Sequence, residues 1–194
     1  DVPPSNMVSI SIPMGGYLKK TQLIPGLYVK KGAVIATLED PSYIQLQQDY
    51  LTATSKLAYL EADYNRQKSL NETKTVSDKV YQIAKSDFES QKYLVKSLSE
   101  KLKLIGLNPA TLNEQTISRS INFPSPINGY VSKVNVNIGK YVNPTDVLFE
   151  IVDPSDLHLR LTVLDNDAAN LKIGNLVSFY ANNNLSKKHL AHVA

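Results

Sequence analysis

The sequence contains no cysteine and no tryptophan among its 194 residues. Without cysteine there can be no disulfides, thiolate metal sites or cysteine nucleophiles. No apolar run approaches the roughly 18–20 residues that a membrane-spanning helix needs. The formal net charge is +3, from 21 Lys and Arg against 18 Asp and Glu, which is too small to indicate a nucleic-acid partner. The composition fits a folded chain of one large domain or a few small modules.

Sequence motifs of catalysis are also missing. There is no phosphate-binding loop, dinucleotide fingerprint, nucleophile elbow or H-E-x-x-H motif. Four carboxylates lie at turns, where helix capping explains them better than acid–base catalysis does: Glu39, Asp40, Glu150 and Asp153. We expect no catalytic residue and no cofactor.

The candidate metal ligands are few. His189 and His192 lie three residues apart, a spacing that could hold a metal on a helix, but a solvated polar segment explains them better. Met7 and Met14 are too few to form a soft copper site by themselves. We expect no metal site.

An internal repeat organises the chain. Residues 16–42 align without a gap on residues 129–155, and ten of the 27 pairs are identical. Each copy carries β-branched and aromatic residues between turn formers such as Pro25-Gly26 and Asn128-Gly129, which predicts short strands. We attribute the recurring glycines to positive φ angles in tight turns. Since one copy cannot bury a core alone, the two should pair face to face as one small sandwich.

Between the copies the apolar residues adopt a helical spacing. The first stripe has the four-and-three spacing of a heptad seam: Leu46, Tyr50, Ala53, Leu57, Leu60 and Tyr64. Asp40 as N-cap and Pro41 as first residue predict where this helix begins.

A second apolar stripe follows. It runs from about Ser77 to Ile105 and includes Val80, Ala84, Gln91, Val95, Leu98, Leu102 and Ile105. Gly106 and Pro109 predict its end, and Ser77 or Thr75 its N-cap. The break over 71–77 is short and polar, so the two stripes predict an antiparallel helical hairpin. Arms of about 29 residues would reach about 43 Å.

The two ends predict further strands. Val8, Ile10 and Ile12 alternate with polar residues and predict a strand that enters the first repeat. Residues 157–163 also alternate, and residues 165–171, 172–175 and 176–180 predict a helical turn, a turn and a strand. We expect this last segment to open a β module that is incomplete at residue 194.

The expected fold class is therefore α+β, mainly β with a long antiparallel helical hairpin. We divide the chain into an N-terminal strand of a β-barrel or linker, a lipoyl-like barrel-sandwich domain in two halves, the hairpin that splits it, and an incomplete β-barrel domain. The respective boundaries are 1–13, then 14–42 with 122–155, then 43–121, and 156–194.

This order of segments resembles the periplasmic adaptor family, the membrane fusion proteins of tripartite efflux pumps in the HlyD-like superfamily. The likeness lies in Gly16-Tyr17-Leu18 through Asp40-Pro41, in Ser125-Pro126-Ile127-Asn128-Gly129 through Asp153-Pro154, and in Asp156-Leu157-His158-Leu159. The amino-acid sequences of the predicted helices and of the segment that begins at Asp156 are most similar to those of adaptors of resistance–nodulation–division (RND) pumps, in the heavy-metal-efflux branch from Bacteroidetes-like bacteria.

A second resemblance lies at the predicted hairpin tip. Adaptors of this family carry an Arg-x3-Leu-x6-Ser pattern that docks on the outer-membrane channel, and Arg66, Leu70 and Ser77 reproduce that spacing. An exposed leucine, arginine donors and a hydroxyl can engage the helix ends of a channel. The same residues also have structural readings, because Leu70 could end the seam, Arg66 could be a solvated charge and Ser77 a helix cap.

The resemblance implies a non-catalytic adaptor in the periplasm, anchored to the inner membrane by a missing N-terminal lipid or transmembrane segment. The implied partners are an outer-membrane efflux channel, an inner-membrane RND transporter and further copies of the chain in a hexameric ring, with no nucleic acid. An adaptor for an ABC or major-facilitator exporter is the main alternative. A coiled-coil scaffold and a lipoyl or biotinyl carrier are the others. The carrier would need its modified lysine on the turn between the halves, where residues 43–128 stand instead.

Overall fold

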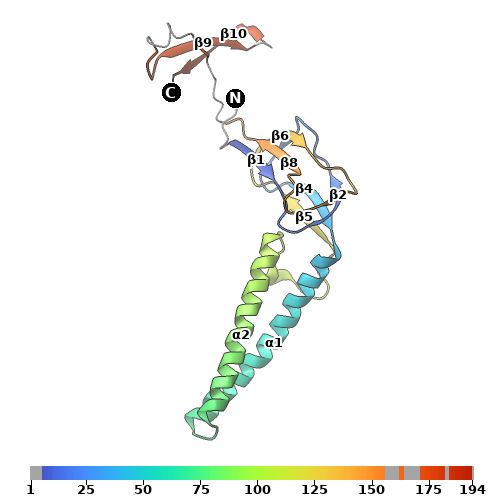
Figure 1. The fold of residues 1–194 in the computed structure, drawn as a ribbon, viewed down its shortest axis with the longest axis vertical. Coiled ribbons are helices and arrows are strands. Elements are labelled where there is room, and N and C mark those ends of the chain that lie inside the picture. The colour runs from blue at the N-terminus through green and yellow to red at the C-terminus, as the bar shows by residue number, and fades with distance from the viewer. Residues whose placement is uncertain (1–5, 156–161, 164–170, 182–183, 194) are drawn as a thin grey trace. The chain divides into compact units, whose positions relative to one another are not determined.

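The computed structural model describes residues 6–155, 162–163, 171–181 and 184–193 (Figure 1). The chain divides into two units, Met7–Asp153 and the remaining residues. The first unit contains a sandwich of two sheets and the two long helices. Neither long helix is apolar enough to cross a membrane, and the same holds for every helix among the described residues.

Two four-stranded antiparallel sheets form the sandwich. The first has the order β1 (Met7–Ile10), β8 (Phe149–Val152), β6 (Gly129–Val134) and β3 (Tyr28–Val29). The second has the order β5 (Ser120–Pro124), β4 (Val34–Glu39), β2 (Gly16–Thr21) and β7 (Tyr141–Val142). Strands β3 and β7 each pair with the other copy of the repeat. The two copies are therefore interlocked rather than merely stacked.

The repeat determines the core of the sandwich. Strands β2 and β6 have the same alternation of buried and exposed residues, and so do β3 and β7. Period-2 alternation turns Leu18 and Val131 inward, and their outward neighbours are Tyr17 and Tyr130. The inward side chains of both sheets form one core, which includes Ile35, Leu38, Val29, Val142, Leu148, Phe149 and Ile151.

Four exposed tyrosines join the two copies. Tyr17 lies opposite Tyr141, and Tyr28 lies opposite Tyr130, as register partners on neighbouring strands. Both pairs meet edge to face, with ring centroids 5.0 and 5.1 Å apart. Cross-strand aromatic pairs stabilise antiparallel strands. The retention of these tyrosines in both copies thus has a structural reason.

The recurring glycines have two reasons, not the single one expected from the sequence. Gly26 and Gly139 adopt φ angles of +86° and +87°, as tight turns require. Gly16 and Gly129 lie in strands and do not have positive φ. A Cβ on Gly16 would lie 2.5 Å from the Tyr43 hydroxyl oxygen, and one on Gly129 would lie 2.5 Å from the Val152 carbonyl oxygen. Close approach of neighbouring atoms explains these two positions.

The N-terminal strand differs from its expected domain. Residues 1–13 were expected to form a β-barrel strand or linker, but Met7–Ile10 pairs with β8 in the sandwich. Strand β5 occupies the equivalent edge of the other sheet, beside β4. The sandwich therefore begins at Met7 rather than at residue 14, and its second half begins at Ser120 rather than at residue 122.

Two long helices form the hairpin. Helix α1 spans Pro41–Glu72 and α2 spans Asp78–Leu104. Asp40 caps α1 by accepting from the Ser42 backbone N–H at 2.8 Å, as its sequence position predicts. At a rise of about 1.5 Å per residue, the arms extend about 48 and 40 Å. A 3₁₀ turn, η2 (Pro109–Thr111), follows before the chain returns to the sandwich.

The expected seam joins these helices, with one error. Ala53, Ala84, Leu98 and Leu102 are buried along it. Val80, which was assigned to the seam, is 42% exposed, and the partly buried Tyr81 takes its place. The Tyr64 ring stacks on Tyr81 and on Phe88, with centroids 5.9 and 5.2 Å away.

Two buried glutamines form hydrogen bonds that stabilise the hairpin. The Gln91 amide donates to the Ala53 carbonyl oxygen across the seam at 2.9 Å. At the base, the fully buried Gln47 donates to the Ser118 carbonyl oxygen at 2.7 Å and accepts from the Ser118 N–H at 3.1 Å. The Gln47 side chain thus bonds both the N–H and the carbonyl group of Ser118, as a neighbouring strand would. These two bonds attach the first turns of α1 to the segment that leads into β5.

The second unit is described only in part. Strand β9 (Leu176–Ala181) pairs antiparallel with β10 (Asn184–His192). The strand expected over 176–180 and the turn over 172–175 are confirmed, the latter by the Asn175 N–H donating to the Lys172 carbonyl oxygen at 3.0 Å. Nearly all of the strand expected over 157–163 and of the helical turn expected over 165–171 lies outside the described residues.

Candidate functional site at the hairpin tip

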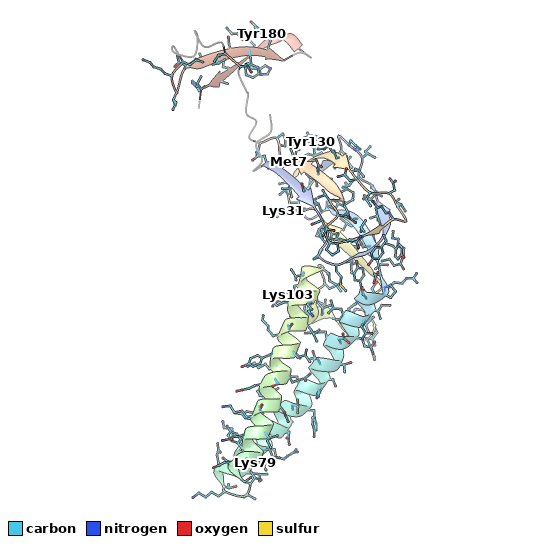
Figure 2. The ribbon with its side chains drawn as sticks, in the orientation of Figure 1. Met7, Lys31, Lys79, Lys103, Tyr130 and Tyr180 are labelled. Carbon is cyan, nitrogen blue, oxygen red and sulfur yellow. The ribbon has the colours of Figure 1, made fainter. Side chains whose placement is uncertain are left out.

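The expected docking residues all lie at the far end of the hairpin from the sandwich. Arg66 and Leu70 are one turn apart near the end of α1, and Ser77 directly precedes α2. Figure 2 labels Lys79 at this end and Lys103 at the opposite end of α2, beside the sandwich. The fold therefore brings the three residues to one short region from two helices.

The connection between the helices has a defined hydrogen-bond pattern. The Thr75 N–H donates to the Leu70 carbonyl oxygen at 2.8 Å, and the Lys74 N–H donates to the Asn71 carbonyl oxygen at 2.8 Å. These two bonds form the Schellman motif, which closes a helix with one residue in the left-handed conformation. That residue is Lys74, with φ +57°. The tip is thus a tight turn with a fixed backbone.

The same motif ends the second helix. The Leu107 N–H donates to the Leu102 carbonyl oxygen and the Gly106 N–H to the Lys103 carbonyl oxygen, both at 3.0 Å. Here the left-handed residue is Gly106, with φ +80°. The predicted end of this helix at Gly106 is confirmed.

Side chains tie the two helix ends together. The Asn71 amide donates to the Asp78 carboxylate at 2.8 Å, so the end of α1 is bonded to the start of α2. The hydroxyls of Thr73 and Thr75 lie 2.9 Å apart within the turn. Ser77 occupies the N-cap position of α2, but its side chain makes no capping hydrogen bond. Ser77 is exposed, and its hydroxyl does not form the capping hydrogen bond that its position predicts.

Arg66 is held by its own helix. Its guanidinium forms an ion pair with Asp63, and its side chain remains 61% exposed. Hydrogen bonds from Gln67 and then from Arg66 hold the pKa of Asp63 below its usual range. Leu70 is partly buried beside the turn. The tip thus offers guanidinium donors, a partly accessible leucine and a free hydroxyl.

Most of the carboxylates and histidines that could have formed a catalytic or metal site elsewhere make structural contacts instead. Glu39 pairs with Lys19 at 3.3 Å and with Arg119, and Glu150 pairs with Lys133 at 3.4 Å. His189 stacks on Phe179 with ring centroids 5.4 Å apart, and both His189 and His192 lie on a strand rather than on a helix. Among the described residues, no group of three or more His, Asp or Glu side chains is placed to hold a metal ion.

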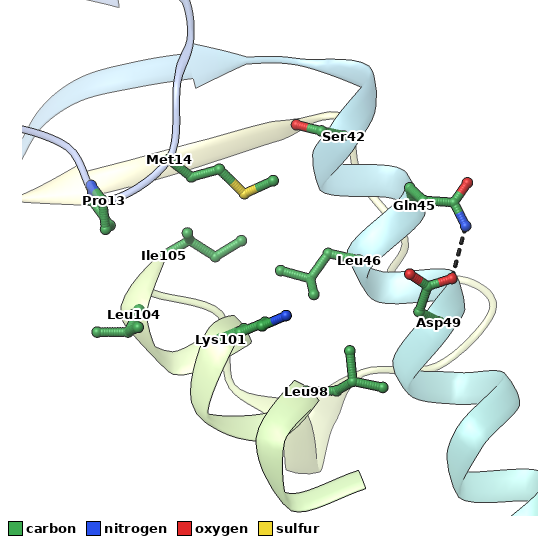
Figure 3. A pocket seen from close by; sticks show the side chains of 10 residues that line it. All are labelled: Pro13, Met14, Ser42, Gln45, Leu46, Asp49, Leu98, Lys101, Leu104 and Ile105. Carbon is green, nitrogen blue, oxygen red and sulfur yellow. Dashed lines mark hydrogen bonds between the residues drawn. The ribbon is translucent and has the colours of Figure 1, made fainter. Parts of the chain in front are cut away.

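A groove of about 440 Å³ lies at the base of the hairpin (Figure 3). Met14, Leu46, Leu98 and Ile105 provide much of its apolar lining, and Lys101 projects among them. On its rim the Gln45 amide donates to the Asp49 carboxylate at 2.7 Å. This groove belongs to the junction of the hairpin and the sandwich, not to the tip.

Comparison with curated proteins finds distant homologues. The cation efflux system protein CzcB of Alcaligenes sp. (strain CT14) is 24% identical over 165 residues, which is 85% of this chain and 31% of that protein. The cobalt-zinc-cadmium resistance protein CzcB of Cupriavidus metallidurans is 23% identical over the same shares. The chain thus spans about a third of the length of these relatives. No protein-family model matches it.

Solved structures establish the architecture. A MacA–MexA chimera that carries the Pseudomonas aeruginosa MexA α-hairpin domain aligns with a TM-score of 0.71 and 23% identity, covering 96% of this chain and 60% of the chimera. The membrane fusion protein Spr0693 of Streptococcus pneumoniae R6 aligns with a TM-score of 0.65 and 18% identity, covering 96% and 79%. The chain has the fold of a membrane fusion protein. This membrane fusion protein fold confirms the expected fold class, and the homology to CzcB confirms the resemblance to heavy-metal-efflux adaptors.

Proposed function

We propose that the protein is the periplasmic adaptor subunit of a tripartite efflux system. It would join an inner-membrane RND transporter to an outer-membrane channel and take no catalytic part. The observation that carries this proposal is the helical hairpin, which is inserted into a lipoyl-like sandwich and ends in a hydrogen-bonded turn with Arg66, Leu70 and Ser77 close by. The homology to the CzcB proteins supports it.

The remaining parts of the assembly follow from the same resemblance. We place the protein in the periplasm, attached to the inner membrane by an N-terminal lipid or transmembrane segment, with six copies in a ring. The names of the homologues favour metal cations as the exported substrate. In this arrangement the energy comes from the transporter, while the adaptor couples the two membrane components and seals the path between them.

Docking at the tip has a direct physical basis. Arg66 presents guanidinium donors that suit carboxylates or the carbonyl groups at a helix end, and Ser77 keeps its hydroxyl available. Leu70 supplies an apolar contact beside them. Because the Asn71 amide donates to the Asp78 carboxylate, the two helix ends that carry these groups are held together, which lowers the entropy lost on docking.

The test is a susceptibility panel of metals and drugs on cells that carry the full-length gene. The strains compared are wild type, deletion, and Arg66→Asp with Leu70→Asp at matched protein abundance. We expect the tip variant to be as sensitive as the deletion, because acidic residues remove both the donors and the apolar contact. Lys92→Asp with Tyr93→Asp is the matched control, since both residues are exposed on the middle of α2.

The outcomes separate the parts of the proposal. If the tip variant stays resistant while the deletion is sensitive, the docking assignment is wrong and the efflux role stands. If the deletion changes no susceptibility, the efflux role loses its support. The compounds affected identify the substrate class. Deleting RND, ABC and major-facilitator transporter genes in turn shows which loss matches the adaptor deletion.

A further inference from the structure

Lys74 stands where glycine is the usual residue. The described residues with a left-handed φ are Gly26, Gly32, Gly106, Gly139, Gly174 and Lys74. Five of these six are glycine, which adopts this conformation without the steric cost of a Cβ. Within the hairpin the contrast is direct, because the same Schellman motif uses Gly106 at the base and Lys74 at the tip. The backbone therefore does not explain the lysine.

The neighbours of Lys74 do not explain it either. At the apex the polar side chains bond to one another, as Thr73 does to Thr75 and Asn71 to Asp78. Lys74 is exposed, and none of the ion pairs between described residues includes it. A side chain that disfavours its own backbone conformation thus ends in an ammonium group with no carboxylate partner in the described part of the chain.

We propose that the Lys74 ammonium is a further docking group at the hairpin tip and that it binds a carboxylate on the outer-membrane channel. This inference rests on the proposed function, since it gives the tip a fourth contact beyond Arg66, Leu70 and Ser77. The charge of Lys74, rather than its backbone, accounts for a lysine at this position. The partner surface must therefore carry acidic groups where the turn meets it.

A protein carboxylate fits the site better than an anionic membrane surface. Asp63, Glu72 and Asp78 alternate with Arg66, Lys68 and Lys79 in the last turns around the tip, so the tip lacks the one-sign basic face that holds a protein on anionic headgroups. The half-buried Leu70 and Val76 flank the turn and suit a protein contact. A tip with charges of both signs suits pairing with a discrete carboxylate rather than with a continuous anionic surface.

The experiment uses the full-length protein in cells and three substitutions with different consequences. Lys74→Gly removes the charge and the backbone strain together, so we expect its melting temperature to equal the wild-type value or exceed it by about 2 °C. The protection it gives in the susceptibility panel should nevertheless fall, by up to about tenfold, because loss of a charge-assisted hydrogen bond weakens binding by about tenfold. Lys74→Gln should lose protection as well, and Lys74→Arg should retain it.

A matched control and a lipid arm make the result decisive. Lys92→Gln removes one exposed lysine from the middle of α2 and should leave protection unchanged. Wild-type protection from Lys74→Gly or Lys74→Gln overturns the proposal. Lys74-dependent binding of the purified protein to vesicles of 70% phosphatidylethanolamine and 30% phosphatidylglycerol overturns it in favour of a lipid contact. If Arg66→Asp with Leu70→Asp also keeps wild-type protection, the whole tip assignment fails together with the Lys74 proposal; if only the Lys74 variants keep it, the Lys74 proposal fails alone.

Discussion

At the scale of single residues, Tyr43 fastens the first helix to the sandwich. Its side chain is fully buried, and its hydroxyl donates to the Gly15 carbonyl oxygen at 2.8 Å. Gly16 leaves the space that this hydroxyl needs. Burial, and then the negative charge of Asp40, raises the pKa of Tyr43 to about 12.

This pKa predicts a loss of stability at high pH. In the unfolded chain the Tyr43 pKa is 10.0, so the folded state holds the proton more tightly. The stabilisation is complete below pH 10 and is lost as the pH rises from 10 to 12, by about 2–3 kcal/mol in the free energy of unfolding. Urea unfolding at several pH values should show this decline in wild type and a shallower one in Tyr43→Phe. Equal slopes in the two proteins would contradict the assignment.

At the scale of elements, the seam between α1 and α2 is thin. Each helix contributes one stripe, and the buried positions include the polar Gln91 as well as apolar residues such as Leu98. Beyond the base, where Tyr43, Leu102 and Ile105 join the core of the sandwich, the two helices are supported only by this stripe. Most helix stability comes from tertiary packing. The hairpin is therefore sensitive to any charge placed on the seam.

Leu98→Asp should unfold the hairpin. Leu98 is 7% exposed, and a carboxylate there would be buried on the apolar seam, at a cost of several kcal/mol. Leu57→Asp on α1 should act in the same direction. The check is the helical circular dichroism signal, which should fall sharply, whereas Tyr93→Asp at a 69% exposed position should preserve it. An intact helical signal in the Leu98 variant would count against the seam.

The sequence predicts what depends on local pattern. The helix starts, the end at Gly106 and most of the seam follow from spacing and caps, which need only neighbouring residues. Val80 was misassigned because two adjacent apolar stripes fit the same period, and only packing against Tyr64 selects Tyr81. Gln47 could not be recognised, because its partner Ser118 lies 71 positions away.

The candidate site likewise has a part that the sequence predicts and a part that it does not. The residues Arg66, Leu70 and Ser77 follow from a resemblance in spacing, and the fold places them together at the tip. The left-handed backbone of Lys74 has no signal in the sequence, where a glycine or asparagine would have marked it. Likewise, the pairing of β1 with β8 joins residues about 140 positions apart, so no local pattern marks it.

At the scale of the whole molecule, the two copies of the repeat hold each other. Because Tyr28 meets Tyr130 and Tyr17 meets Tyr141 in equivalent positions, Tyr28→Ala and Tyr141→Ala should destabilise the protein alike. We expect about 0.5–1.5 kcal/mol from each lost ring pair, measured by urea unfolding. If only one substitution lowers the free energy of unfolding, the two tyrosine pairs do not contribute equally to stability.

The hairpin leaves and re-enters the sandwich at adjacent residues of one sheet. Glu39 at the end of β4 is the register partner of Ser120 at the start of β5, so the whole helical excursion is the loop of a β-hairpin. Loops of this kind change length without altering the strands that hold them. Adding or removing one heptad in each arm would change its reach by about 10.5 Å while preserving the seam and both sheets. The hairpin is thus an adjustable spacer, and evolution can set its span separately from the body that carries it.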